Sequence, residues 1–156
     1  MDRTQWVTFN LEDETYGVDV MLVQEVLRNT EIAPVPGSDN YILGIINLRG
    51  SVVTVIDART RFNLMPREQD DTTRIIIVEV EDNVIGILVD SVAEVVEIDN
   101  DNIENNPTVK DDEASRYIQG VCQLEGKEKV LLILVDLKRL LAAEIGLEVD
   151  QATAFF

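Results

Sequence analysis

Arg49 is the residue whose type and setting best fit a binding role in this chain. It stands at the tip of a predicted hairpin, between the largely apolar stretches 45–48 and 52–56. A guanidinium can hold a carboxylate through two parallel hydrogen bonds while its stem packs on apolar surface. Arg49 can therefore contact a partner, clamp two elements of the fold through an acid such as Glu25, or point into solvent. The residues alone leave these three roles open.

Catalytic and metal-binding chemistry finds no positive support in the sequence. The chain contains no histidine, which removes Ser-His and Cys-His pairs and histidine-ligated metal sites. The phosphate-binding glycine patterns GxGxxG and GxxxxGK are also absent. The run at 99–106 resembles a calcium loop, but its sixth and twelfth positions are Glu104 and Lys110, where that loop needs glycine and glutamate. We expect a protein that is not an enzyme and that uses no cofactor and no metal.

The charge balance argues against nucleic acid and lipid partners. The chain has thirty acidic and thirteen basic residues, which gives a net charge of −17. Such a field repels phosphate backbones and anionic lipid surfaces over roughly 8 Å at physiological salt. The longest uninterrupted apolar run, at 130–135, is far shorter than the roughly 20 residues that cross a bilayer. The lone Cys122 fits a buried thiol in a reducing compartment. We expect a cytoplasmic protein with no direct membrane insertion.

The sequence is an internal duplication, with the second copy displaced by 69 residues in its first part. Positions that match under this shift include Phe9 and Val78, Gly17 and Gly86, and Glu25 and Glu94. Further along, the segment YILGIINLRG at 41–50 returns as YIQGVCQLEG at 117–126. A repeat of about half the chain predicts two similar structural units.

These units are expected at 1–68 and 69–148, followed by a tail at 149–156. Whether the two halves exchange strands is left open. The copies differ most clearly at Arg49, whose counterpart in the second copy is Glu125.

Short strands dominate the predicted secondary structure. Alternation of apolar and polar residues predicts β-hairpins over 7–18 and 75–89. Short helices are expected over 20–27, 39–43 and 91–96, with Asp19, Ser38 and Asp90 as their N-caps, and two more after the capping residues Asp57 and Asp136. Many short strands joined by tight turns predict an all-β double barrel.

Several stretches, in this order, resemble the bacterial chemotaxis coupling protein (CheW) family. They are EDETYGVDVMLVQEV at 12–26, VP at 35–36, GIINLRG at 44–50, VID at 55–57, DTTRIIIVEV at 71–80, IGILVDSVAEVVEI at 85–98, YIQGVCQLEG at 117–126 and LLILVDL at 131–137. The resemblance implies two similar SH3-like five-stranded β-barrels with a few short helices and no catalytic activity. It also implies an adaptor that couples methyl-accepting chemotaxis receptors to the regulatory domain of the chemotaxis histidine kinase (CheA) in signalling arrays.

The same resemblance assigns roles to individual residues. It implies receptor binding by Val23, Gly44 and Arg49, with Glu25 as the acid that pairs with the arginine. It implies kinase binding by Ile32 and Val52. The chain departs from the family at Thr54, where proline is usual, and at Ala58, where leucine is usual. Loss of the proline frees an N–H on a strand that we expect at a sheet edge.

Two other functions remain open at this point. One is the regulatory CheW-like domain of a histidine kinase, or of a coupling protein with a receiver domain, although the methionine start and the end shortly after the last predicted helix argue against it. The other is a small barrel that binds nucleic acid or a small ligand, which the charge and the lack of converging polar groups disfavour.

Overall fold

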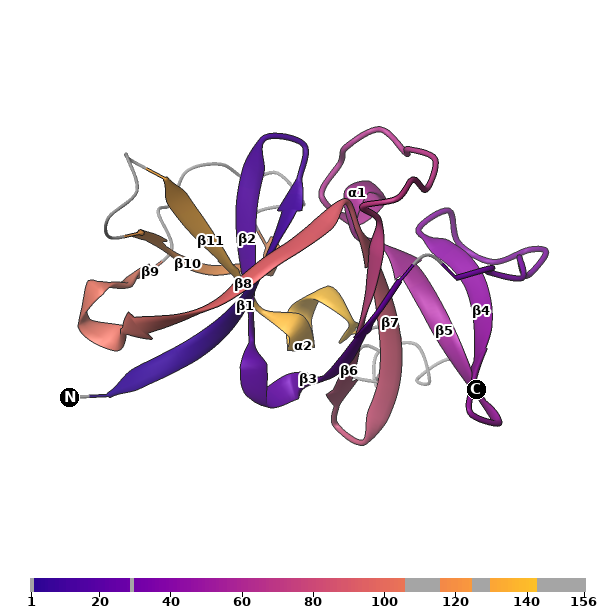
Figure 1. Cartoon of the computed structure of the whole chain (residues 1–156), viewed down its shortest axis with the longest axis horizontal. Helices are drawn as coiled ribbons and strands as arrows, with labels where there is room; N and C mark the ends of the chain where they lie inside the picture. Colours follow the sequence, from indigo (N-terminus) through magenta and orange to yellow (C-terminus); the bar gives the residue numbers. More distant parts are fainter. Residues whose placement is uncertain (1, 29, 106–115, 125–129, 143–156) are drawn as a thin grey trace, which may run out of the picture.

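The computed structural model describes residues 2–28, 30–105, 116–124 and 130–142, and two β-sheets dominate it (Figure 1). The six-stranded sheet, here called barrel A, has the order β8-β1-β2-β11-β10-β9. Its strands are β1 (Arg3–Leu11), β2 (Glu14–Asp19), β8 (Ser91–Asp99), β9 (Glu104–Asn105), β10 (Ile118–Gln123) and β11 (Leu131–Val135).

The five-stranded sheet, here called barrel B, has the order β3-β6-β7-β5-β4. Its strands are β3 (Val23–Leu27), β4 (Ile42–Leu48), β5 (Ser51–Asp57), β6 (Arg74–Val80) and β7 (Asn83–Val89). Four short helices complete the described elements: the 3-10 helices η1 (Val20–Leu22) and η2 (Asn100–Asn102), and the α-helices α1 (Ala58–Arg61) and α2 (Leu137–Leu140). The predicted all-β double barrel is confirmed, with the two-residue strand β9 added to barrel A.

Each barrel contains strands from both halves of the sequence. The hairpin β1–β2 belongs to the first half, yet it pairs with β8 on one side and with β11 on the other. The hairpin β6–β7 belongs to the second half and pairs in the same way with β3 and β5. The boundary between 1–68 and 69–148 therefore separates the two sequence copies, while the two sheets exchange hairpins across it. The predicted tail at 149–156 lies outside the described residues.

Three apolar clusters explain why so many strands are almost continuously hydrophobic. Side chains of a strand alternate between its two faces. In β6, Ile75 and Ile77 point into the core of barrel B, whereas Ile76, Val78 and Val80 join a larger cluster that includes residues of both sheets. Barrel A has its own core around Trp6 and Leu134. Strands at the junction of the barrels are thus buried on both faces.

Two helices predicted after the hairpins are wrong. Only Val20–Leu22 forms a turn of 3-10 helix, and residues Val23–Leu27 continue as strand β3, paired with β6. Likewise Ser91–Asp99 is strand β8, paired with β1. Apolar residues spaced by three fit a helix, but both segments are rich in β-branched valine, and pairing with a neighbouring strand decides the outcome.

The predicted caps are partly correct. Asp19, Asp57 and Asp136 each accept a hydrogen bond from a backbone N–H of the helix that follows. Asp90 caps no helix and instead binds side chains of another element. The predicted helix at 39–43 is also wrong: Ser38 donates its hydroxyl to the carbonyl of Val35, and strand β4 already begins at Ile42.

Strand β5 is not at a sheet edge, so the expectation for Thr54 is wrong. It lies between β4 and β7, and Thr54 is opposite Ile45 on one side and Ile85 on the other. In the parts of the chain that the structure describes, no helix has the length and apolar character needed to span a bilayer.

Gly44 allows two backbone segments to approach closely. Ala33 and Ile45 form an isolated bridge with two backbone hydrogen bonds of 2.9 Å. A Cβ atom on Gly44 would lie 2.1 Å from the carbonyl oxygen of Ala33, and the φ angle of Gly44 is +150°. In the second copy, Gly120 has the same role, because its Cβ would meet the carbonyl oxygen of Glu104 at 2.8 Å.

We predict that Gly44→Ala lowers the free energy of unfolding by about 2–4 kcal/mol, since it combines backbone strain with a clash against Ala33. The matched control is Gly50→Ala, where φ is +91° but no atom lies within 4 Å of the new Cβ. It should lose only about 1–2 kcal/mol. Equilibrium urea unfolding measures both, and equal losses would contradict the role of close approach.

Candidate functional site

Arg49 and Glu25 form an exposed ion pair that connects two distant strands of barrel B. Arg49 lies in the turn between β4 and β5 with a φ angle of 51°. Both of its terminal nitrogens donate to the carboxylate of Glu25, Nη1 to Oε1 at 3.3 Å and Nη2 to Oε2. Its side chain is 69% exposed and that of Glu25 is 28% exposed. The pairing expected between these two residues is confirmed.

The topology gives this ion pair a structural consequence. β3 and β4 are the two edge strands of barrel B, so they have no shared ladder of backbone hydrogen bonds. Glu25 lies on β3 and Arg49 follows β4 directly. The ion pair therefore spans the seam where the sheet curves back on itself, and it holds the guanidinium in one orientation at the surface.

The other residues expected to bind the receptor lie on the same two strands. Val23 begins β3, not a helix, and its half-buried side chain packs against the cluster shared by both barrels. Gly44 is a buried residue of β4, at the bridge to Ala33 described above. All four receptor residues thus belong to barrel B, although only Arg49 presents a largely exposed side chain.

The two residues expected to bind the kinase differ in exposure. Val52, in β5, is 69% exposed, as expected for a contact surface. It borders a surface hollow of about 400 Å³ lined also by Tyr41, Ile42 and Ile85. Ile32 is half-buried and packs against the core of barrel B, so most of its side chain stabilises the fold.

Barrel A repeats part of this surface. Val26 and Val95 are matching residues of the duplication, and both are exposed. Val52 and Leu131 also match and are also exposed. The charges of the ion pair are not repeated in the sequence, because Arg49 and Glu25 match Glu125 and Glu94; Glu125 lies outside the described parts of the chain.

A second cluster of charged residues, which the sequence reasoning missed, lies between the barrels around the buried side chain of Arg59. Arg59 of α1 binds Asp90 through two hydrogen bonds of 2.7 Å, from Nε and Nη2. Its Nη1 donates to Glu12 Oε1 at 2.6 Å and to the carbonyl of Met65 at 2.9 Å. A sequence signal existed: Arg59 and Glu12 both match charged residues of the second copy, Lys138 and Glu81, with the same signs.

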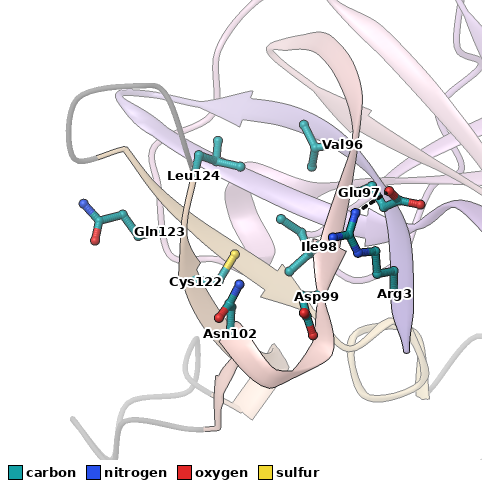
Figure 2. A pocket seen from close by; sticks show the side chains of 9 residues that line it. All are labelled: Arg3, Val96, Glu97, Ile98, Asp99, Asn102, Cys122, Gln123 and Leu124. Atoms are coloured by element: carbon teal, nitrogen blue, oxygen red, sulfur yellow. Dashed lines mark hydrogen bonds and ion pairs between the residues drawn. The ribbon is translucent and has the colours of Figure 1, made fainter. Parts of the chain in front are cut away.

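A pocket of about 260 Å³ in barrel A is a weak candidate for a ligand site (Figure 2). Val96, Ile98 and Leu124 line its apolar part, and the ion pair of Arg3 with Glu97 lies on its rim. Cys122 also lines it, and burial raises the pKa of this thiol, which keeps it protonated and unreactive. Within the described residues, no group of three or more Cys, Asp or Glu side chains is arranged to hold a metal ion.

The fold and the exposed groups together indicate a class of protein. Two β-barrels share an apolar cluster, and the surface carries the Arg49–Glu25 ion pair and exposed apolar residues such as Val52. This is the surface of a scaffold that binds other proteins.

Comparison with known proteins identifies the family. The chain belongs to the CheW-like domain family, whose model matches residues 5–144. It is 34% identical to a chemotaxis protein CheW of Bacillus subtilis over 140 residues, which are 88% of this chain and 86% of that protein. It is 30% identical to a chemotaxis protein CheW of Treponema pallidum, covering 92% of this chain and 85% of that protein.

The solved structures give the same result for the fold. The crystal structure of the scaffolding protein TtCheW from Thermoanaerobacter tengcongensis superposes with a TM-score of 0.77 at 34% identity. The match covers 86% of this chain and 89% of that one. The chain is therefore a chemotaxis scaffold protein with two SH3-like barrels.

The ion pair makes a testable prediction about pH. The hydrogen bond from Arg49 lowers the pKa of Glu25 below its ordinary value of 4.5. A lowered carboxylate pKa stabilises the folded state above pH 4.5, and this contribution is lost as the pH falls through the folded pKa. In Arg49→Ala the Glu25 pKa should return toward 4.5, as measured by carboxyl ¹³C NMR titration. Arg3→Ala, which breaks the separate exposed pair with Glu97, should leave the titration of Glu25 unchanged.

Proposed function

We propose that this protein couples methyl-accepting chemotaxis receptors to the regulatory domain of the chemotaxis histidine kinase, CheA, as a non-catalytic adaptor. It would act in the cytoplasm, at receptor arrays. The observation that carries the proposal is the exposed guanidinium of Arg49, held by Glu25 across the seam of barrel B in a protein of the CheW-like family.

The receptor is proposed to bind at β3 and the β4–β5 turn. An arginine already held in one rotamer loses less conformational freedom when a partner binds, and its remaining donors can still reach a carboxylate or a carbonyl of a receptor helix. Glu25 and Val23 lie on the same strand, two residues apart, with a β-bulge between them. Gly44 supports this site by keeping β4 close to Ala33.

The kinase domain is proposed to bind at Val52. The hollow beside Val52 is formed by β4, β5 and β7 and combines apolar and polar side chains. An apolar side chain of the kinase domain would fill it and cover Val52 from water. Both sites lie on barrel B, with Arg49 in the β4–β5 turn and Val52 on β5 opposite Asn47, and the proposal assigns them to two different partners.

The strength of such contacts fits an array component. A single contact patch of modest area gives a dissociation constant of about 1 μM, or a binding free energy of roughly −8 kcal/mol. Many copies held together in an array raise the effective affinity without new contacts. A net charge of −17 also favours partners with exposed basic residues over nucleic acid.

We predict that Arg49→Ala weakens binding of a receptor signalling hairpin by roughly tenfold or more, because it removes a central charged contact. The thermal unfolding midpoint should change little, since the Arg49–Glu25 pair is exposed. Isothermal titration calorimetry and calorimetric unfolding measure the two effects. The matched control is Arg3→Ala, an exposed arginine that also pairs with a glutamate. Loss of stability together with binding would show that Arg49 is structural.

A second prediction separates the kinase surface from the receptor surface. Val52→Ser should weaken binding of the isolated kinase regulatory domain by roughly tenfold, because an exposed apolar contact is lost. Binding of the receptor hairpin should be unchanged. Met65→Ser, which alters another highly exposed apolar residue, serves as the control. Equal effects of Val52→Ser on both partners would contradict separate surfaces.

A further inference from the structure

The two α-helices hold the two barrels together in the same way. Helix α1 follows β5 of barrel B, and its Arg59 binds Glu12 in the β1–β2 turn of barrel A. Helix α2 follows β11 of barrel A, and its Lys138 binds Glu81 in the β6–β7 turn of barrel B at 3.1 Å. Glu12 and Glu81 even share a positive φ angle, 54° and 51°. Each barrel thus contributes a cation that holds the hairpin turn of the other.

Of these two ion pairs, only the one made by Arg59 has a buried cation and a second carboxylate partner. The side chain of Arg59 is 5% exposed, and it binds Asp90 as well as Glu12. By contrast, Lys138 and Glu81 are 61% and 46% exposed. The residue that matches Asp90 in the first copy is Met21, an exposed side chain without charge. The two matching ion pairs between the barrels therefore differ: the one at Arg59 is buried and reinforced, and the one at Lys138 is exposed.

Asp90 occupies the point where the chain passes from one barrel to the other. It lies between the end of β7 in barrel B and the start of β8 in barrel A. Besides Arg59, it accepts hydrogen bonds from the backbone N–H of Glu12 at 2.9 Å and from Arg67 at 3.2 Å. Its own N–H donates to the carbonyl of Asn10 in β1. One carboxylate thus joins α1, the crossover and the β1–β2 hairpin.

Directional contacts of this kind restrict the distance and angle between the barrels, which the apolar contacts between them do only weakly. The cluster shared by the barrels is stabilised by removal of apolar surface from water, which depends weakly on angle. A bidentate guanidinium–carboxylate pair is planar and restricts both distance and angle. Burial alone would raise the pKa of Asp90, yet the hydrogen bonds from Arg59 and Glu12 outweigh it and lower this pKa. The charged pair is thus retained in its buried site.

We propose that Arg59 is a positioning residue that fixes the angle between the two barrels through Asp90 and Glu12. This inference goes beyond the proposed adaptor function, because it concerns how barrel A is held against barrel B, whereas both proposed binding surfaces lie on barrel B. Loosening the Arg59 connection should therefore leave each binding surface intact and change the arrangement of the two barrels.

The experiment measures the geometry first. Spin labels on Ser51→Cys in barrel B and Gln119→Cys in barrel A, both exposed positions, are placed in a Cys122→Ala background. Pulsed electron paramagnetic resonance then gives the distribution of distances between them. Arg59→Lys, which keeps the charge but loses the planar fork, should broaden this distribution. Because Arg59 is buried and its substitution risks loss of folding, Glu12→Gln, at the exposed end of the cluster, is the second variant.

The matched control is Glu81→Gln, which breaks the equivalent exposed pair of the other copy and should leave the distribution as narrow as in the unsubstituted chain. Because both proposed binding surfaces lie on barrel B, the affinity of Glu12→Gln for the receptor hairpin and for the kinase domain, measured separately, should stay within about twofold.

Two outcomes distinguish failure of the positioning role of Arg59 from failure of the proposed adaptor function. Unchanged distance distributions in both Arg59→Lys and Glu12→Gln overturn the positioning role. Failure of the unsubstituted chain to bind either partner overturns the proposed adaptor function, and the distances then still decide whether Arg59 fixes the barrels.

Discussion

Pairing of strands between the two sequence copies is the constraint on which this structure depends. Each barrel needs the hairpin of the other copy, because β1 pairs with β8 and β6 pairs with β3. Neither copy can satisfy its backbone hydrogen bonds or bury both faces of its hairpin alone. The exchange also forces the chain to cross between the barrels after β2 and after β7, and it places the largest apolar cluster at that crossing. The barrels are therefore parts of one cooperative unit, with a junction that the whole chain must build.

The two sequence copies differ at two arginine positions of the first copy, Arg49 and Arg59. Arg49 joins the edge strands of barrel B at the surface, and its counterpart is an acid. Arg59 joins the barrels in the interior, and its counterpart is an exposed lysine. Both arginines use the same planar fork on a carboxylate, but burial gives them different roles. The buried pair restricts geometry, because breaking it would leave a charge without a partner. The exposed pair contributes little to stability, which leaves its arginine available for binding.

The sequence predicted those structural features that are determined by residues close together in the chain. The hairpins at β1–β2 and β6–β7 were predicted correctly, since alternation and turn residues lie within each segment. The caps Asp19, Asp57 and Asp136 were also local. Strands β3 and β8 were predicted as helices because their partners, β6 and β1, lie far away in the sequence. The Glu25–Arg49 pair was one of the roles that the residues left open, and the family resemblance favoured it, whereas Arg59 was missed because its partners come from three separate segments.

The proposed roles of Arg49 in binding and of Arg59 in positioning have a common physical basis. An interaction that mainly serves the fold should be largely buried and hydrogen-bonded at most of its donors, as at Arg59, whose guanidinium makes four hydrogen bonds to three residues. An interaction that serves a partner should be oriented but incomplete. Arg49 fits the second description, because Glu25 fixes its direction while most of the side chain stays in contact with water. A receptor group that approaches this arginine finds its geometry already set, so less entropy is lost on binding. In the proposed complex, Glu25 would therefore act on the affinity even without touching the receptor.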